Sequence, residues 1–260
     1  SRRSEIKKMM EEQVFIKGFE IFMRRKDGGL HWVSNTAQTI RDQHGNSLYY
    51  EGTIEDITSR KLAEESAKQL KQTLLGTLQA LSQSIEIREP GIAGHHKRVS
   101  NLARALARAM NLEEDITESI RMAGFVHDIG DMSVPSDILS KPGRLSALEY
   151  SFIKIHPRSG YDILKETGLP YPVAEIVLQH HERMNGSGYP QSLKGKDVLL
   201  EARILAVADV VEAMASPRPY RPALGIDAAL DEIRKNKGTL YDAQVVETCL
   251  TLFKSKKFQF

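Results

Sequence analysis

The stretch that decides the fold is Ile204-Leu205-Ala206-Val207-Ala208-Asp209-Val210, an apolar helical run that contains one carboxylate. A buried charge without a partner costs several kcal/mol, so Asp209 needs a compensating group inside the protein. A bound cation is the simplest such group. The run therefore predicts a buried helix that contributes one ligand to a metal site.

Histidines supply further candidate ligands upstream of this run. Six of the eight histidines fall between His95 and His181, and most of them stand beside Asp, Glu or another His. Each candidate lies on a segment that otherwise has the pattern of a buried helix or its end. The predicted metal ligands are His95, His127, Asp128, His156, His180, His181 and Asp209.

The ligand types and their spacing indicate two divalent transition metal ions. Imidazole and carboxylate without thiolate suit Fe or Mn best, with Zn, Ni and Co as alternatives, and argue against a finger-type zinc site. Neighbouring residues on a helix point about 100° apart, so His180 and His181 suggest two different ions. We expect Asp128 to bridge both. Two cations roughly 3.5–4 Å apart are suited to the hydrolysis of phosphate esters.

An isolated histidine is more often a hydrogen-bonded core or surface residue than a metal ligand. His31 and His44 fall in or beside the predicted strands of the front segment. His96 is expected to be a surface neighbour of His95. None of these three is predicted to bind metal.

Composition excludes several classes of protein. The chain of 260 residues carries 36 basic and 34 acidic side chains, a net charge of +2. This balance is too even for a protein that binds duplex nucleic acid or an anionic membrane surface. The single Cys249 excludes a disulfide framework and fits the cytoplasm. No apolar run approaches the roughly 18 residues that span a bilayer, so we expect no membrane segment.

Three segments follow one another along the chain. Residues 1–57 contain three stretches of β character separated by turns at 26–29 and 42–46, which predict a small antiparallel sheet. Residues 58–80 show apolar side chains at spacings of three and four, as in an amphipathic helix. Residues 81–260 have helical patterns throughout. The predicted fold class is mainly α, a helical domain preceded by a linker helix and a short β segment.

The linker helix has two interpretations. Leu70, Leu74 and Leu78 follow one another at spacings of four, which breaks a strict heptad. The helix either lies on its own domain or pairs with a second chain as a parallel coiled coil. The coiled coil, and with it a homodimer, is favoured because the segment connects a β region to an α region.

At the histidine motifs the chain resembles the HD-GYP domain of the HD superfamily. The motifs extend from about residue 80 to the C-terminus and are highly specific in combination. They are Ala93-Gly94-His95-His96-Lys97-Arg98-Val99, His127-Asp128-Ile129-Gly130, His156-Pro157, His180-His181-Glu182-Arg183, Gly188-Tyr189-Pro190, Val207-Ala208-Asp209 and Arg218-Pro219-Tyr220-Arg221-Pro222.

This resemblance implies an all-helical bacterial phosphodiesterase that opens cyclic di-GMP, or the mixed cyclic GMP-AMP, to a linear dinucleotide and in some members further to GMP. It places metal ligands at the same seven residues. It also implies that Arg218 and Arg221 grip substrate phosphates and that Gly188 and Tyr189 shape the loop beside the guanine pocket. His127, Asp128 and position 131 form the implied catalytic centre, where a metal-bound hydroxide would attack phosphorus.

Two positions depart from the pattern of the family. Asp131 stands where the family usually has a Lys close to the scissile phosphate, so the sign of the local charge is reversed. Gly91 stands where some members have a Glu and hold three metals, so we expect two here. Asp131 keeps a second hypothesis open, a receptor that binds a cyclic dinucleotide but hydrolyses it weakly. A third hypothesis, a hydrolase of nucleotides or alarmones, is disfavoured by the Gly-Tyr-Pro loop.

The front segment resembles the C-terminal half of a PAS sensor domain. The residues that carry this resemblance are Arg25-Lys26-Asp27-Gly28, Trp32-Val33, Tyr50-Glu51-Gly52-Thr53 and Asp56-Ile57-Thr58-Ser59-Arg60-Lys61. The resemblance implies that a signal reaches the helical domain through the linker helix.

Overall fold

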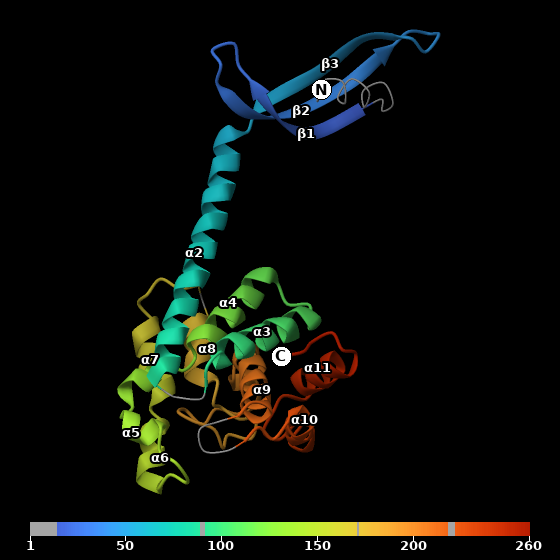
Figure 1. Cartoon of the computed structure of the whole chain (residues 1–260). Coiled ribbons are helices and arrows are strands. Elements are labelled where there is room, and N and C mark those ends of the chain that lie inside the picture. The colour runs from blue at the N-terminus through green and yellow to red at the C-terminus, as the bar shows by residue number, and fades with distance from the viewer. Residues whose placement is uncertain (1–14, 89–91, 171, 218–221) are drawn as a thin grey trace. The chain divides into compact units, whose positions relative to one another are not determined.

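The computed structural model describes residues 15–88, 92–170, 172–217 and 222–260. The chain forms two compact units, residues 1–74 and 75–260, and helix α2 (Thr58–Arg88) contributes residues to both (Figure 1). No described helix is long and apolar enough to cross a membrane. Gly91, Arg218 and Arg221, to which the sequence analysis assigned roles, fall outside the described residues.

The first unit contains the predicted three-stranded antiparallel sheet, in the order β1-β2-β3. Its strands are β1 (Phe15–Arg24), β2 (Leu30–Arg41) and β3 (Ser47–Asp56). Gly28 has a φ of +91° in the first hairpin turn, a conformation that favours glycine. Every residue of β3 is exposed, whereas Ile21 and Val33 are buried on the neighbouring strands.

Helix α2 changes its surroundings along its length. Leu62 and Leu70, in its first half, are 63% and 71% exposed. Leu78 and Ile85, further along, are 4% and 5% exposed, and both belong to the second unit. The apolar stripe predicted from the sequence therefore packs on the helical unit only toward the C-terminal end of α2.

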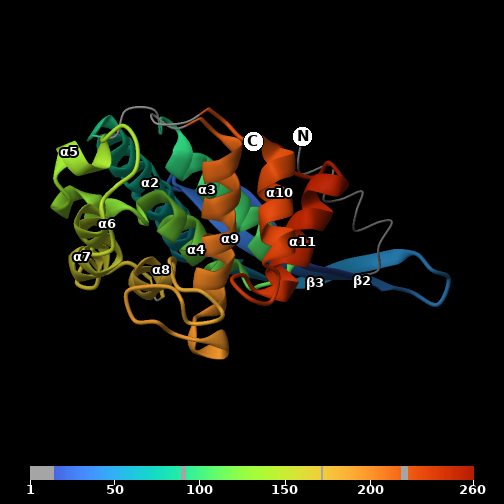
Figure 2. The same cartoon turned by 90° about the horizontal axis from the view of Figure 1, so that it is seen from below.

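The second unit is helical, as predicted, with α9 at its centre (Figure 2). Helix α9 packs against α3, α4, α8, α10 and α11. The elements that follow α2 are α3 (His95–Ala109), α4 (Glu114–Val126), η1 (Ile129–Ser133), α5 (Ser136–Leu139), α6 (Ala147–Ile153), α7 (His156–Leu164), α8 (Val173–Gln179), η2 (Gly195–Asp197), α9 (Leu200–Ala215), α10 (Ile226–Lys235) and α11 (Ala243–Lys254).

Helix α9 lies at the centre of the helical unit because its middle is apolar. All residues from Ile204 to Ala208 are buried, because the helix is apolar on every face. Asp209 and Glu212 lie three residues apart and therefore share one face of this buried helix. The fold thus places two carboxylates in its interior.

A close contact of η1 with α7 fixes the distance between two histidine motifs. A Cβ added to Gly130 would lie 1.9 Å from the carbonyl oxygen of His156 and 2.6 Å from the amide nitrogen of Gly160. Only glycine permits this approach, which brings the His127-Asp128 pair next to His156. The Gly of His-Asp-Ile-Gly is therefore a packing requirement.

We predict that Gly130→Ala lowers the free energy of unfolding by about 1–3 kcal/mol, because the new methyl group must push two backbone segments apart. Urea denaturation of the purified chain measures this change. The matched control is Gly76→Ala in α2, where a Cβ meets nothing within 4 Å. This control should stabilise the helix by about 0.5–1 kcal/mol. Equal stability of the two variants would contradict the packing role of Gly130.

Candidate metal centre

Five elements bring all seven predicted ligands into one cluster. His95 begins α3, His127 and Asp128 follow α4, and His156 begins α7. His180 and His181 follow α8, and Asp209 lies within α9. The cluster therefore depends on the packing of segments up to 114 residues apart in the chain (95 to 209).

The potential ligand atoms fall into groups whose members lie within 4.8 Å of one another. One group is Asp128, His156, His180 and His181, and a second is His95, His127 and Asp209. A third group consists of His96, His127 and Asp128. Sets of three or four imidazole and carboxylate groups at this spacing fit a divalent transition metal.

Asp128 faces both halves of the cluster. Its Oδ2 lies 3.0 Å from Nε2 of His127. Its Oδ1 lies 3.6 Å from Nε2 of His156 and 3.8 Å from Nε2 of His180. This geometry fits the bridging position that the sequence analysis expected for Asp128.

Three of the imidazoles are oriented by carbonyl oxygens at helix ends. Nδ1 of His127 donates to Gly124 at 3.1 Å, Nδ1 of His156 to Ile153 at 2.8 Å, and Nδ1 of His180 to Val177 at 2.6 Å. These carbonyls belong to the last turns of α4, α6 and α8, where intrahelical partners run out. Each bond leaves the lone pair of Nε2 directed at the cluster, the tautomer that a metal ligand needs.

His95 is oriented by a carboxylate instead. Its Nδ1 is hydrogen-bonded to Glu212, which is fully buried. Glu212 also accepts from Nε of Arg98 at 2.6 Å and from Oγ of Ser216 at 2.6 Å. Glu212 was not among the predicted site residues, although its position three residues after Asp209 on an apolar helix was the signal for it.

His96 corrects a prediction. It was expected at the surface, but it is fully buried. Nδ1 of His96 lies 3.0 Å from Oε1 of Glu86, and Nε2 lies 3.4 Å from Oδ2 of Asp128. The physical reason is that Glu86 of α2 lies over the first turn of α3 and also accepts from the amide of Gly94 at 2.7 Å. The other two excluded histidines, His31 and His44, belong to none of the metal-ligand groups found among the described residues.

Burial and mutual charge set the protonation of the cluster. Burial opposes ionisation of Asp128 and Asp209, but the surrounding imidazoles hold the pKa of both carboxyls well below the ordinary value. Burial, together with the neighbouring imidazoles of His127 and His156, lowers the pKa of His180 to about 3. Ionised carboxylates beside a neutral imidazole are the protonation states in which these groups bind cations.

A cavity of about 560 Å³ adjoins the cluster. Its walls include Asp131, Lys141, Arg144 and Tyr150 together with several of the predicted ligands. Asp131 is 8% exposed, and its Oδ1 lies 3.6 Å from Nδ1 of His156. Substrate would therefore meet both the metal cluster and a mixture of acidic and basic side chains.

The Gly188-Tyr189-Pro190 loop is fixed beside the cluster. The ring of Tyr189 stacks on His181 with a centroid distance of 4.8 Å and an interplanar angle of 29°. A Cβ on Gly188 would lie 2.4 Å from Cα of Glu182. Glu182 is buried and accepts from the amides of Gln191 at 2.7 Å and Leu193 at 3.0 Å. The carboxylate of Glu182, which the sequence analysis did not single out, thus shapes the loop.

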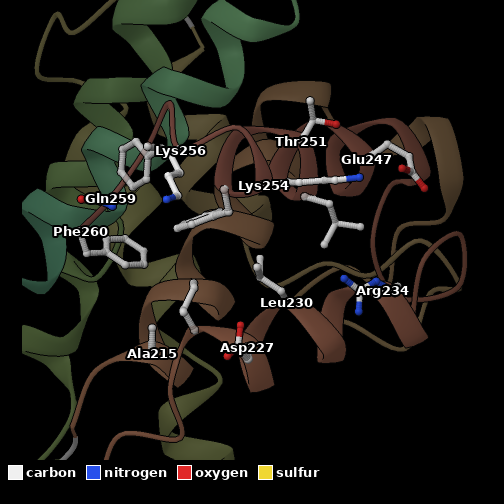
Figure 3. A pocket seen from close by; sticks show the side chains of 14 residues that line it. Ala215, Asp227, Leu230, Arg234, Glu247, Thr251, Lys254, Lys256, Gln259 and Phe260 are labelled. Carbon is white, nitrogen blue, oxygen red and sulfur yellow. The ribbon is translucent and has the colours of Figure 1, made fainter.

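A larger cavity of about 890 Å³ lies between α10, α11 and the residues that follow α11 (Figure 3). Figure 3 shows Asp227 and Arg234 on one side and Glu247 and Lys254 on the other. None of the metal-ligand groups in the described part of the chain lies in this cavity. His95, Asp128, His156, His181 and Asp209 line the smaller cavity instead.

Comparison with known proteins places the chain in a family. A family model described as an HD domain matches residues 79–245. The cyclic di-GMP phosphodiesterase response regulator RpfG of Xanthomonas campestris is 37% identical over 218 residues, which cover 81% of this chain and 58% of that protein. The 3'3'-cGAMP-specific phosphodiesterase 2 of Vibrio cholerae is 33% identical over 200 residues, covering 76% and 37%.

A solved structure shares the fold. An HDG"Y"P protein from Bdellovibrio bacteriovorus matches with a TM-score of 0.55 at 22% identity, over 73% of this chain and 64% of that one. The chain belongs to the HD domain family, and the resemblance to HD-GYP domains stated from the motifs is confirmed. It spans 58% and 37% of the lengths of the two relatives.

We predict that Glu212→Gln weakens the binding of Mn²⁺ by about 10–100-fold, because the amide orients His95 less firmly than a carboxylate does. Titration of the chelator-stripped chain with Mn²⁺ measures this affinity. Glu201→Gln, at the other end of α9, is the matched control and should bind as the unmodified chain does. A Glu212→Gln variant with unchanged affinity would refute the orienting role.

Proposed function

We propose that this chain hydrolyses a phosphodiester bond of cyclic di-GMP or of a related cyclic dinucleotide such as cyclic GMP-AMP. The observation that carries the proposal is the cluster around Asp128, whose two oxygens face separate sets of imidazoles next to a 560 Å³ cavity. The names of the relatives in Xanthomonas and Vibrio support the same class of substrate. The third hypothesis, hydrolysis of nucleotides or alarmones, has no such support.

Two divalent ions fit the cluster, with Fe or Mn as the best suited and Zn, Ni or Co as alternatives. His95, His127 and Asp209 would hold one, and His156, His180 and His181 the other, with Asp128 between them. Bound divalent ions supply polarisation of the phosphoryl oxygens and a water of lowered pKa.

The side chains around the cluster would bind and orient the substrate. His127 and Asp128 form the catalytic centre, and the partly exposed ring stack of His181 and Tyr189 offers a flat wall for a guanine base. Arg144 and Lys141 add positive charge to the cavity wall, where phosphates can be bound. From the motif, Arg218 and Arg221 would contribute in the same way, and Gly188 keeps the loop close to the cluster.

In the hydrolysis, the oxygen of a water molecule forms a bond to phosphorus while the bond from phosphorus to the ribose 3′ oxygen breaks. The water loses one proton, and the departing 3′ oxygen takes up one proton to become a hydroxyl. The first product is the linear dinucleotide, and a second cleavage of the same kind would give GMP.

Asp131 favours a second candidate function, a receptor that binds a cyclic dinucleotide and hydrolyses it slowly. Its carboxylate lines the cavity and lies close to His156. A negative charge here repels a phosphodiester, whereas a Lys would attract it. The receptor hypothesis keeps the same binding site and differs only in the rate of turnover.

The front of the chain suggests how the site would be controlled. Leu62 and Leu70 are exposed on the first half of α2, which supports coiled-coil pairing of two chains as a homodimer. The sheet unit would act as the C-terminal part of a PAS sensor, and the even charge and single thiol fit a cytoplasmic protein.

We predict that the chain loaded with Mn²⁺ or Fe²⁺ converts cyclic di-GMP or cyclic GMP-AMP to a linear dinucleotide. Asp128→Asn should lower kcat/KM by at least about 100-fold, because loss of a shared ligand exceeds the usual effect of an outer-shell change. Chromatographic separation of the nucleotides gives the rate, and His44→Ala is the control. Binding of both dinucleotides without any linear product would leave the receptor function in its place.

We also predict that Asp131→Lys raises kcat/KM roughly 10-fold, which corresponds to ~1.4 kcal/mol of improved attraction to the phosphate. The same assay measures the rate. Asp137→Lys makes the same change of net charge at an exposed position on α5 and should leave the rate unchanged. A rate that stays level or falls in Asp131→Lys would show that the sign of the charge is not the cause of slow turnover.

A further inference from the structure

Glu86 and His96 form a buried pair at the edge of the metal cluster that the seven predicted ligands do not include. His96 is fully buried, and its Nε2 makes no hydrogen bond with any described residue. This nitrogen lies 3.4 Å from Oδ2 of Asp128, the oxygen that also faces His127. A buried polar atom without a hydrogen bond is costly unless something compensates it.

The orientation of His96 is that of a metal ligand. Oε1 of Glu86 accepts from Nδ1 of His96 at 3.0 Å and from its amide at 3.2 Å. The other carboxylate–histidine pair of the site, Glu212 with His95, has the same arrangement. A carboxylate on Nδ1 fixes the proton there and directs the lone pair of Nε2 at the cluster.

The distance from Nε2 of His96 to Oδ2 of Asp128 also suits coordination better than a hydrogen bond. Two ligand atoms that each lie about 2.1 Å from one cation are separated by roughly 3.0–3.5 Å in octahedral or tetrahedral geometry. The separations of 3.4 Å and 3.0 Å from Oδ2 of Asp128 to His96 and His127 fall in this range. An N–H···O hydrogen bond is usually 2.7–3.2 Å long.

We propose that His96 is a further cation ligand, which shares a divalent ion with His127 and Asp128, and that Glu86 is its positioning residue. The proposal rests on the metal centre of the proposed function but not on its substrate. It adds an imidazole to the side of Asp128 that His95 and His127 also face.

The alternative is a protonated His96 that forms an ion pair with Asp128. Burial opposes the charge, but the negative carboxylates of Asp128 and Glu86 raise the pKa of His96 to about 9. The two carboxylates thus favour positive charge at Nε2, and a divalent ion provides more of it than a proton does. Proton and cation compete for the same lone pair, so direct metal binding decides between them.

The experiment is a titration of the full chain, stripped with a chelator, with Mn²⁺ in the absence of nucleotide. Calorimetry gives the affinities, and elemental analysis after dialysis gives the number of ions per chain. The variants are His96→Gln, which keeps a polar side chain of similar length, and Glu86→Gln. The control is His44→Gln, which removes an exposed imidazole of the sheet unit.

For His96→Gln we expect either the loss of one bound Mn²⁺ per chain or a decrease of at least 10-fold in the affinity for one Mn²⁺. For Glu86→Gln we expect a smaller decrease in the same affinity. With Co²⁺ in place of Mn²⁺, the visible absorption spectrum should change in His96→Gln at full occupancy. An ion-pair partner of Asp128 would leave that spectrum unaltered. Unchanged ion number, affinities and Co²⁺ spectrum in His96→Gln, with unchanged far-UV circular dichroism, would overturn the proposal.

The outcome is independent of catalysis. If the chain hydrolyses no cyclic dinucleotide but His96→Gln weakens Mn²⁺ binding, the proposed function fails and this inference holds. If Mn²⁺ binding is unaffected in His96→Gln while the unmodified chain hydrolyses a cyclic dinucleotide, this inference fails and the proposed function holds. Should His96→Gln fold poorly, Glu86→Gln tests the same pair, and an affinity equal to that of the unmodified chain then contradicts the inference.

Discussion

The structure of the helical unit depends on the compensation of one largely enclosed carboxylate, that of Asp128, whose side chain is 17% exposed. Its two oxygens face different sets of imidazoles, so the negative charge is compensated from two sides. Because those neighbours come from α3, the end of α4, α7 and the end of α8, these segments must converge on a single point. Gly130 makes the closest of these approaches possible, since no side chain fits between η1 and α7.

Helix ends give the cluster its orientation. The last turns of α4, α6 and α8 leave carbonyl oxygens without intrahelical partners, and Nδ1 of a histidine uses one in each case. The partial negative charge at these helix ends also favours cations nearby. His95 and His96 are oriented by carboxylates instead: Glu212 accepts from His95, and Glu86 accepts from His96.

Helix α2 contacts this centre directly. Glu86 holds the first turn of α3, and Arg88 donates to the carbonyl oxygens of Asp131 at 3.3 Å and Val134 at 3.2 Å. Both residues lie in the last turn of the helix that also contributes to the sheet unit. A helix that is exposed at Leu62 and buried at Ile85 is thereby tied to the residues around the proposed site.

The sequence by itself determined the mainly helical fold, the three-stranded sheet and the seven clustered ligand candidates, because periodicity and a carboxylate in an apolar run are local signals. Only the tertiary structure decided the roles of Glu86, His96, Glu182 and Glu212. Glu86 lies 10 residues from His96 along the chain, and Glu212 lies 117 residues from His95. Spacing along the chain therefore carries no information about these contacts. His96 was predicted to lie at the surface because the sequence indicated its own helix, α3, but not that the C-terminal end of α2 covers the first turn of that helix. Burial is a property of neighbours, and neighbours are fixed only when the helices pack.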